Sequence, residues 1–196
     1  MNTIMRKSVL GIAGLAFAAG IATGPQHLTD TTTVDTRPVA AVQADKPTVD
    51  KDKLIPHGVQ GDQSHIDLGD EQTTNAKAII AATKKAGMDE RAAVISIATS
   101  LQESKLENLG HLGDRNDHDS QGLFQQRPSS GWGTVEQITD PEYATLAFLK
   151  GLKQVDGWHD MPLTKAAQTV QVSAYPDHYA QWEQQAADLV TQHWNN

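Results

Sequence analysis

The sequence predicts an all-α domain, because its C-terminal part is a series of helical patterns without a convincing strand. Apolar residues recur at spacings of three and four in successive segments between residues 74 and 194. Glycine and proline stand between these segments, where helices commonly end or begin. No internal repeat occurs, and the β structure we expect is at most a small hairpin in the polar loop that follows residue 108.

Two helices open the predicted domain, which we expect to span residues 72–196. Thr74 can cap the first, which runs over residues 75–86 and ends at Gly87. Asp89 can cap the second, over residues 90–104. Its residues are apolar or small almost all round, so we expect it to be central in the domain; its main stripe consists of Val94, Ile97, Ala98 and Leu101.

Three further helices complete the prediction. The pair Asp140-Pro141 places proline at the first helical position and begins a helix that extends to about residue 155. Residues 161–174 form another, which Pro176 ends, and residues 177–194 form the last. Together these segments predict a fold class, a helical domain with a polar loop, and leave its activity open.

The first 22 residues have the pattern of a secretory signal sequence. Arg6 and Lys7 precede the apolar run 8–22, which ends in small residues suited to cleavage. The run is short for a membrane span, although an uncleaved N-terminal anchor is the alternative. The sequence therefore predicts a secreted or cell-surface protein. It contains no cysteine, which excludes a lipoprotein attachment site, disulfides and cysteine chemistry.

Residues 23–71 are rich in Thr, Asp, Val, Pro and Lys, and they have no aromatic residue and no helical period. This composition predicts a disordered spacer between the cell surface and the domain. A short strand near residues 31–34 is the alternative. The formal net charge of the chain is −8 and there is no basic stripe. Nucleic acid and anionic lipid are therefore not expected partners, and a membrane is expected only through an uncleaved N-terminus.

One carboxylate, Glu103, closes the central helix. Ala92, Ser96 and Thr99 share its face at spacings of three and four, so small side chains leave room for a groove beside it. No lysine or arginine stands three or four positions away, whereas Glu107 does. The helix C-terminus, this like charge and partial burial each favour the protonated carboxyl, as a general acid requires. The alternative is an exposed glutamate at a helix end without a function.

A second motif follows one loop downstream. "ATSLQESKLEN" and then "SQGLFQQRP" resemble, in order, the motifs of the lysozyme-like domain of lytic transglycosylases and goose-type lysozymes. The resemblance covers residues 74–194 and rests on Glu103, Ser104, Ser120, Gly122, Leu123, Phe124, Gln125 and Pro128. It implies an exported enzyme that cleaves the glycan strands of peptidoglycan. A non-catalytic module of the same fold that binds cell-wall glycan is the alternative, and an exported helical interaction protein is a third interpretation.

The resemblance implies that Glu103 is the general acid/base. In a transglycosylase the 6-hydroxyl of muramic acid closes an anhydro ring, so that one essential carboxylate is enough. Ordinary glycosidases need two carboxylates, and a second would have to come from Asp114, Asp117 or Asp119. We therefore favour a lytic transglycosylase over a hydrolase.

The resemblance also implies a set of substrate-binding residues. Gly122 would allow the backbone to approach a sugar, and Ser120 and Gln125 would supply hydrogen bonds. Trp132 is a candidate sugar platform, or alternatively a core or lid residue. The late Ala-Tyr-Asn-Gly segment of the family is matched only at Ala174-Tyr175, because Pro176-Asp177 follows. The complete set is Ser120, Gly122, Leu123, Phe124, Gln125, Trp132, Tyr175 and Tyr179.

The acidic loop 114–119 has a second interpretation as a calcium loop. Asp117, Asp119 and Gly122 imitate its first half, but Pro128 stands where the bidentate glutamate belongs. A solvated loop is the simpler interpretation. The histidines show no metal-ligand spacing. The sequence accordingly predicts no metal site and no cofactor, and it leaves the oligomeric state open.

Overall fold

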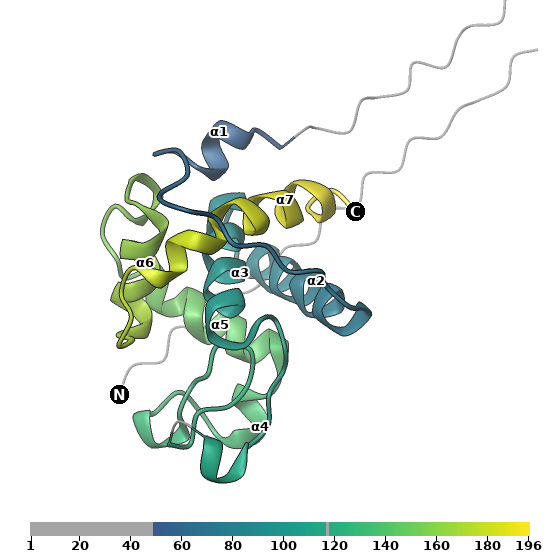
Figure 1. The fold of residues 1–196 in the computed structure, drawn as a ribbon, viewed down its shortest axis with the longest axis vertical. Coiled ribbons are helices and arrows are strands. Elements are labelled where there is room, and N and C mark those ends of the chain that lie inside the picture. The colour runs from purple at the N-terminus through teal and green to yellow at the C-terminus, as the bar shows by residue number, and fades with distance from the viewer. Residues whose placement is uncertain (1–48, 117) are drawn as a thin grey trace, which may run out of the picture. The chain divides into compact units, whose positions relative to one another are not determined.

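The computed structural model in Figure 1 describes residues 49–116 and 118–196. The regular secondary structure of these residues is helical, which confirms the prediction of an all-α domain. The single β pairing among them is an isolated antiparallel bridge between Gln121 and Gln126, where the polar loop ends. The predicted signal sequence and the spacer up to residue 48 lie outside the described residues. None of the helices described here has the length and apolar character needed to cross a membrane.

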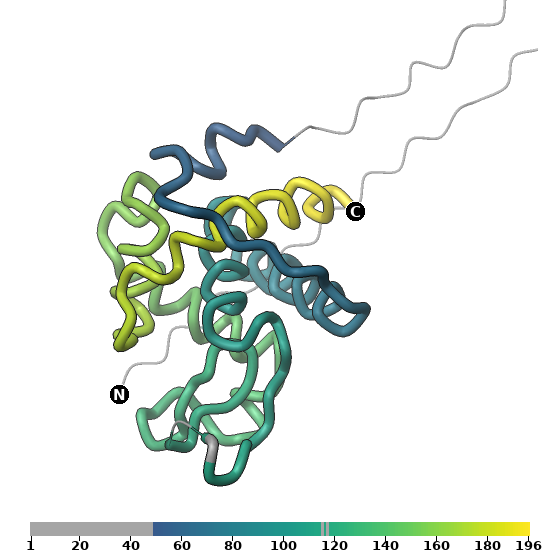
Figure 2. Tube along the Cα trace, in the orientation of Figure 1, coloured from purple at the N-terminus to yellow at the C-terminus, as the bar shows by residue number. Residues whose placement is uncertain are grey.

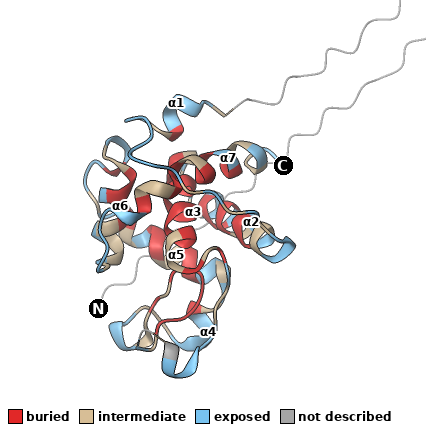
Figure 3. Cartoon of the chain, viewed as in Figure 1, coloured by how far each residue is buried: buried red, intermediate tan, exposed pale blue. Residues whose placement is uncertain are grey.

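Helix α3 (Glu90–Ser104) is the centre of the domain, as its pattern predicts (Figures 1 and 3). The Asp89 carboxylate caps it by accepting a hydrogen bond from the amide of Ala92 at 3.2 Å. Its residues from Arg91 to Leu101 are all buried, because other helices pack around it. Its principal neighbours among the α-helices are α2 (Asp70–Lys85), α5 (Pro141–Leu152), α6 (Leu163–Gln171) and α7 (Glu183–His193).

Several of the predicted helix boundaries are wrong; α6, for example, ends at Gln171 and not at residue 174. Helix α2 begins at Asp70, with Gly69 as its cap, and the Thr74 hydroxyl instead donates to the carbonyl of Asp70 inside the helix. The last predicted helix is divided: a 3₁₀ helix, η4 (His178–Trp182), precedes α7. The predicted start of α5 is confirmed, because Pro141 is its first residue and the Asp140 carboxylate caps it by accepting from the amide of Tyr143 at 2.7 Å.

Short helices connect the long ones. Helix α4 (Val135–Ile138) precedes α5, and α1 (Lys51–Leu54) lies near the start of the described chain. The remaining 3₁₀ helices are η1 (Gly113–Arg115), η2 (Pro128–Ser130) and η3 (Trp158–Asp160).

Residues 49–69, which we call the N-terminal strap, lie against the helical domain and pass over α7 and η4 (Figure 2). Leu54 is fully buried, and the amide of Ser64 donates to the carbonyl of Gln181 at 2.7 Å. The backbone of Ile66 exchanges two hydrogen bonds with the side chain of Gln185. The prediction of a disordered spacer is therefore wrong for this part of residues 23–71. Composition could not reveal it, because partners distant in the sequence hold the strap.

Replacing Leu54 with alanine tests whether the strap is part of the folded domain. Removal of a fully buried leucine side chain typically costs about 2–5 kcal/mol of unfolding free energy, and we expect the lower end because the strap is peripheral. Val59 lies on the same strap and is 39% exposed, so Val59→Ala should change the free energy by less than about 0.5 kcal/mol. Urea unfolding measures both. Equal stabilities of Leu54→Ala and the parent would mean that the strap is detached in solution.

Candidate active site

A groove with a volume of about 720 Å³ opens beside the C-terminal end of α3. Glu103 lines it from that helix, and the segment after α6 forms another part of its lining. Trp132 and Arg127 line it from the loop around η2. The complete lining is Gln102, Glu103, Arg127, Ser130, Trp132, Val170, Gln171, Val172, Ser173, Ala174 and Tyr175. The groove thus combines one carboxylate with two aromatic rings and several hydrogen-bonding side chains.

Tyr179 is the partner of Glu103. Its hydroxyl donates to Glu103 Oε1 at 2.7 Å, from a side chain that is fully buried in η4. Burial raises the pKa of Tyr179 well above its usual range, the negative charge of Glu103 raises it further, and the Ser173 hydroxyl opposes the rise. The phenol therefore keeps its proton throughout the physiological range and remains a hydrogen-bond donor. Tyr179 is predicted from the sequence to bind substrate; in the structure it holds the carboxylate.

A charged neighbour of Glu103 is Lys105, the residue at which α3 ends in a left-handed conformation with φ 58°. Its ammonium donates to the carbonyl of Leu101 at 3.0 Å and lies 4.4 Å from the centre of the Trp182 ring. Burial lowers the pKa of Lys105, and the negative charge of Glu103 opposes that change. Helical spacing did not reveal this interaction because the chain leaves the helix at Lys105.

On the expectation from the sequence that Glu103 is the general acid of glycan cleavage, Tyr179→Phe should move the alkaline limb of the pH–rate profile to higher pH. A hydrogen bond donated to a carboxylate favours its ionised form, and bonds to charged groups contribute roughly 1.5 kcal/mol or more. Its loss should make Glu103 hold its proton to a pH about one unit higher. The measurement is the initial rate across pH for parent and variant. An unchanged midpoint of the profile would show that the Tyr179 hydroxyl does not influence the ionisation of Glu103.

Arg127 of the second motif lines the groove, whereas residues 120–125 of the motif do not. The hydroxyl of Ser104 donates to the carbonyl of Leu123 at 2.8 Å, which fastens the motif to the end of the helix. Leu123 and Phe124 are core residues, and this differs from their predicted role in substrate binding. In the structure, these residues of the motif therefore stabilise the loop that follows α3.

Three polar or small residues of this motif also have structural partners. Gly122 has φ +76°, and a Cβ there would lie 2.0 Å from the carbonyl oxygen of Ile138. The close approach that it allows is to protein backbone, not to the groove. Ser120 is buried, and its hydroxyl accepts from Arg127 Nε at 2.9 Å. The side-chain amide of Gln125 donates to the carbonyl of Gly122 at 3.1 Å. None of these three residues is part of the groove lining.

Two predicted aromatic residues do line the groove, Trp132 and Tyr175. Tyr175 is 62% exposed, and its ring stacks on that of His178 with the centres 4.9 Å apart. Val172, beside it, is 79% exposed and has φ 52°, a strained conformation for a β-branched residue. The pattern of side chains did not single out Val172, because such a pattern does not report backbone strain.

Among the described residues of the acidic loop, none supplies a carboxylate to the groove lining. The Asp119 carboxylate instead accepts from the amide and the hydroxyl of Ser129, at 2.8 and 2.7 Å. These hydrogen bonds lower the pKa of Asp119, with the backbone amide of Ser129 as the largest cause. Within residues 49–116 and 118–196 no three acidic, histidine or cysteine residues form a metal-ligating cluster.

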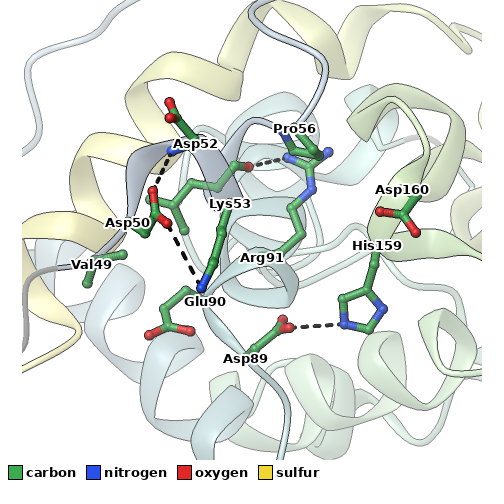
Figure 4. A pocket seen from close by; sticks show the side chains of 11 residues that line it. Val49, Asp50, Asp52, Lys53, Pro56, Asp89, Glu90, Arg91, His159 and Asp160 are labelled. Atoms are coloured by element: carbon green, nitrogen blue, oxygen red, sulfur yellow. Dashed lines mark hydrogen bonds and ion pairs between the residues drawn. The ribbon is translucent and has the colours of Figure 1, made fainter.

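A second pocket, of about 450 Å³, lies between the strap and the start of α3 (Figure 4). In its lining, Asp89 and His159 are in direct contact, with Oδ2 and Nε2 3.0 Å apart. Its lining contains acidic and basic side chains together and is separate from the groove beside Glu103.

Comparisons of the chain with protein-family models and with curated proteins find no match. The residues and the geometry described above are therefore the basis for any assignment of function.

Proposed function

We propose that this protein is an exported peptidoglycan-cleaving enzyme of the lysozyme-like class, with Glu103 as its general acid/base. The observation that carries the proposal is the position of Glu103 in a groove of about 720 Å³, next to a buried tyrosine that donates a hydrogen bond to it. Two aromatic rings in the same lining are suited to the apolar faces of sugar rings. The resemblance of the two motifs to lytic transglycosylases supports the same conclusion.

A lytic transglycosylase is favoured over a hydrolase because Glu103 is the one carboxylate in the described lining of the groove. Inverting and retaining hydrolases place a second carboxyl group on the opposite side of the scissile bond. In the proposed reaction, Glu103 gives its proton to the glycosidic oxygen as the bond to C1 breaks. Glu103 then takes the proton of the muramic acid 6-hydroxyl while that oxygen bonds to C1. The carboxyl group ends protonated, as it began, and no water is consumed.

A glycan-binding module without catalysis is the second candidate function. The observation that favours it is the structural role of the second motif, whose residues Leu123 and Phe124 belong to the core. A protein that had lost catalysis would still need these residues to pack its core, so the motif would be retained. The two candidates agree on the groove and on its ligand, and they differ in whether a bond is broken.

Mass spectrometry of the material released from purified peptidoglycan by the full-length protein separates these functions. The proposed enzyme should release disaccharide-peptides that end in 1,6-anhydromuramic acid. Products heavier by one water would indicate a hydrolase. Retention of the protein on peptidoglycan without release would select the binding module, and neither retention nor release would contradict both proposals.

A further inference from the structure

Gln102 lies immediately before Glu103 and lines the same groove. It belongs to the last turn of α3, and its side chain is only partly buried. The sequence motifs gave it no role. The hydrogen bonds of Gln102, however, determine the orientation of its side-chain amide.

Two donors meet the carbonyl oxygen of the Gln102 side chain. Trp182 Nε1 lies 2.9 Å from Gln102 Oε1, and Gln181 Nε2 lies 3.0 Å from it. An indole N–H can only donate, so the amide cannot be turned the other way without two donors facing each other. Gln181 and Trp182 are not part of the groove lining. The NH₂ group of Gln102 is therefore the end of the amide that is available to the groove.

The N-terminal strap stabilises this orientation through hydrogen bonds to Gln181 and to the backbone of η4. The hydroxyl of Ser64 donates to Gln181 Oε1 at 2.7 Å, which directs the NH₂ of Gln181 towards Gln102. Gln63 Nε2 donates to the carbonyl of Ala180 at 3.0 Å and holds the same turn of η4. A donor whose direction is fixed before the ligand arrives binds with a smaller entropic cost.

We propose that the NH₂ group of Gln102 donates a hydrogen bond to the acetamido carbonyl of an N-acetylhexosamine bound beside Glu103. This inference rests on the proposed glycan-cleaving function. An uncharged donor suits an uncharged acceptor, and the neighbouring Glu103 disfavours an anionic group at this place. An amide carbonyl is the strongest neutral acceptor on an N-acetylated sugar, so Gln102 would select such sugars over sugars that carry a hydroxyl at the same carbon.

The test compares two tetrasaccharides, β1,4-linked N-acetylglucosamine and β1,4-linked glucose, by calorimetry on the full-length protein. Gln102→Glu keeps an acceptor for Trp182 and removes the donor, and Gln102→Met removes both. Each variant should bind the N-acetylated tetramer about fivefold to tenfold more weakly, as expected for one lost hydrogen bond. Affinity for the glucose tetramer should stay within about twofold. The side-chain NH₂ resonances of Gln102 in the parent should shift on binding of the N-acetylated tetramer.

Gln154→Glu is the matched control, because this exposed glutamine is outside the groove lining. It makes the same chemical change and should alter neither affinity. Undiminished binding of the N-acetylated tetramer by both Gln102 variants would overturn the inference and leave the proposed function standing, and so would equal losses for both tetramers. Absence of binding by the parent to the N-acetylated tetramer would overturn the groove as a glycan site, and the inference with it.

Discussion

Glu103→Gln should lower the rate of glycan cleavage by on the order of 10²-fold or more while the fold is retained. Glutamine has nearly the shape of glutamate, and its amide oxygen can still accept the hydrogen bond from Tyr179. It has no carboxylic proton to give to the glycosidic oxygen. The variant should therefore bind glycan and unfold at the parent's denaturant concentration, but release product more slowly by on the order of 10²-fold or more.

The control for this variant is Glu107→Gln, which removes an exposed carboxylate from the same region of the chain. It should keep the parent's rate to within about twofold. Release of muropeptides is measured by chromatography under identical conditions for the parent and both variants. Full activity of Glu103→Gln would end the assignment of the general acid, and inactivity of both variants would indicate a general effect of charge.

The sequence was sufficient where local chemistry decides structure. The cap at Asp89 and the nearly all-apolar pattern of residues 90–104 predicted a buried central helix, and the structure has it. Asp140-Pro141 likewise predicted the start of α5. In each case the signal lies within one turn of the feature that it predicts, because helix capping and amphipathicity are local properties.

The candidate site was less predictable because distant segments build it. Glu103 and Trp132 were expected at the groove and do line it. The contact of Tyr179 with Glu103 joins residues 76 positions apart, and the strap contacts η4 over more than a hundred positions. No periodicity reports such contacts. The motif at residues 120–125 shows a related limit of sequence: a glycine that lets two backbones meet, as Gly122 does, and one that admits a ligand look the same.

A buried ion pair between Arg91 and Glu183 carries the largest expected effect on stability. Arg91 Nη1 lies 2.7 Å from Glu183 Oε1, and both side chains are less than 5% exposed. The guanidinium also donates to the backbone carbonyls of Leu54 and Met161. It thereby connects α3 with α7, with the strap and with the chain that precedes α6. Sequence analysis missed it because a charged residue in the first turn of a helix is commonly exposed.

Arg91→Met should lower the free energy of unfolding at neutral pH by about 3–5 kcal/mol, because it leaves a buried carboxylate without its cation. Lys85→Met is the control, since Lys85 pairs with Glu142 on the surface and exposed pairs contribute less than about 1 kcal/mol. Chemical unfolding of the two variants and the parent measures both values. Removing both partners, as in Arg91→Met with Glu183→Leu, should recover much of the loss because no buried charge is then left.

The pH dependence of the unfolding free energy distinguishes the effect of an unpaired buried Glu183 carboxylate from a simple loss of packing. Burial raises the pKa of Glu183, and the charges of Arg91 and His57 oppose that rise. Without Arg91, native Glu183 holds its proton more tightly than unfolded Glu183, so the variant is stabilised as the pH falls towards the unfolded value of about 4.3. This stabilisation is lost as the pH rises through the folded value. The difference in unfolding free energy between parent and Arg91→Met should therefore be largest at pH 7–8 and clearly smaller near pH 5. A difference that does not change over this range would show that Arg91 stabilises the domain through packing and backbone contacts alone.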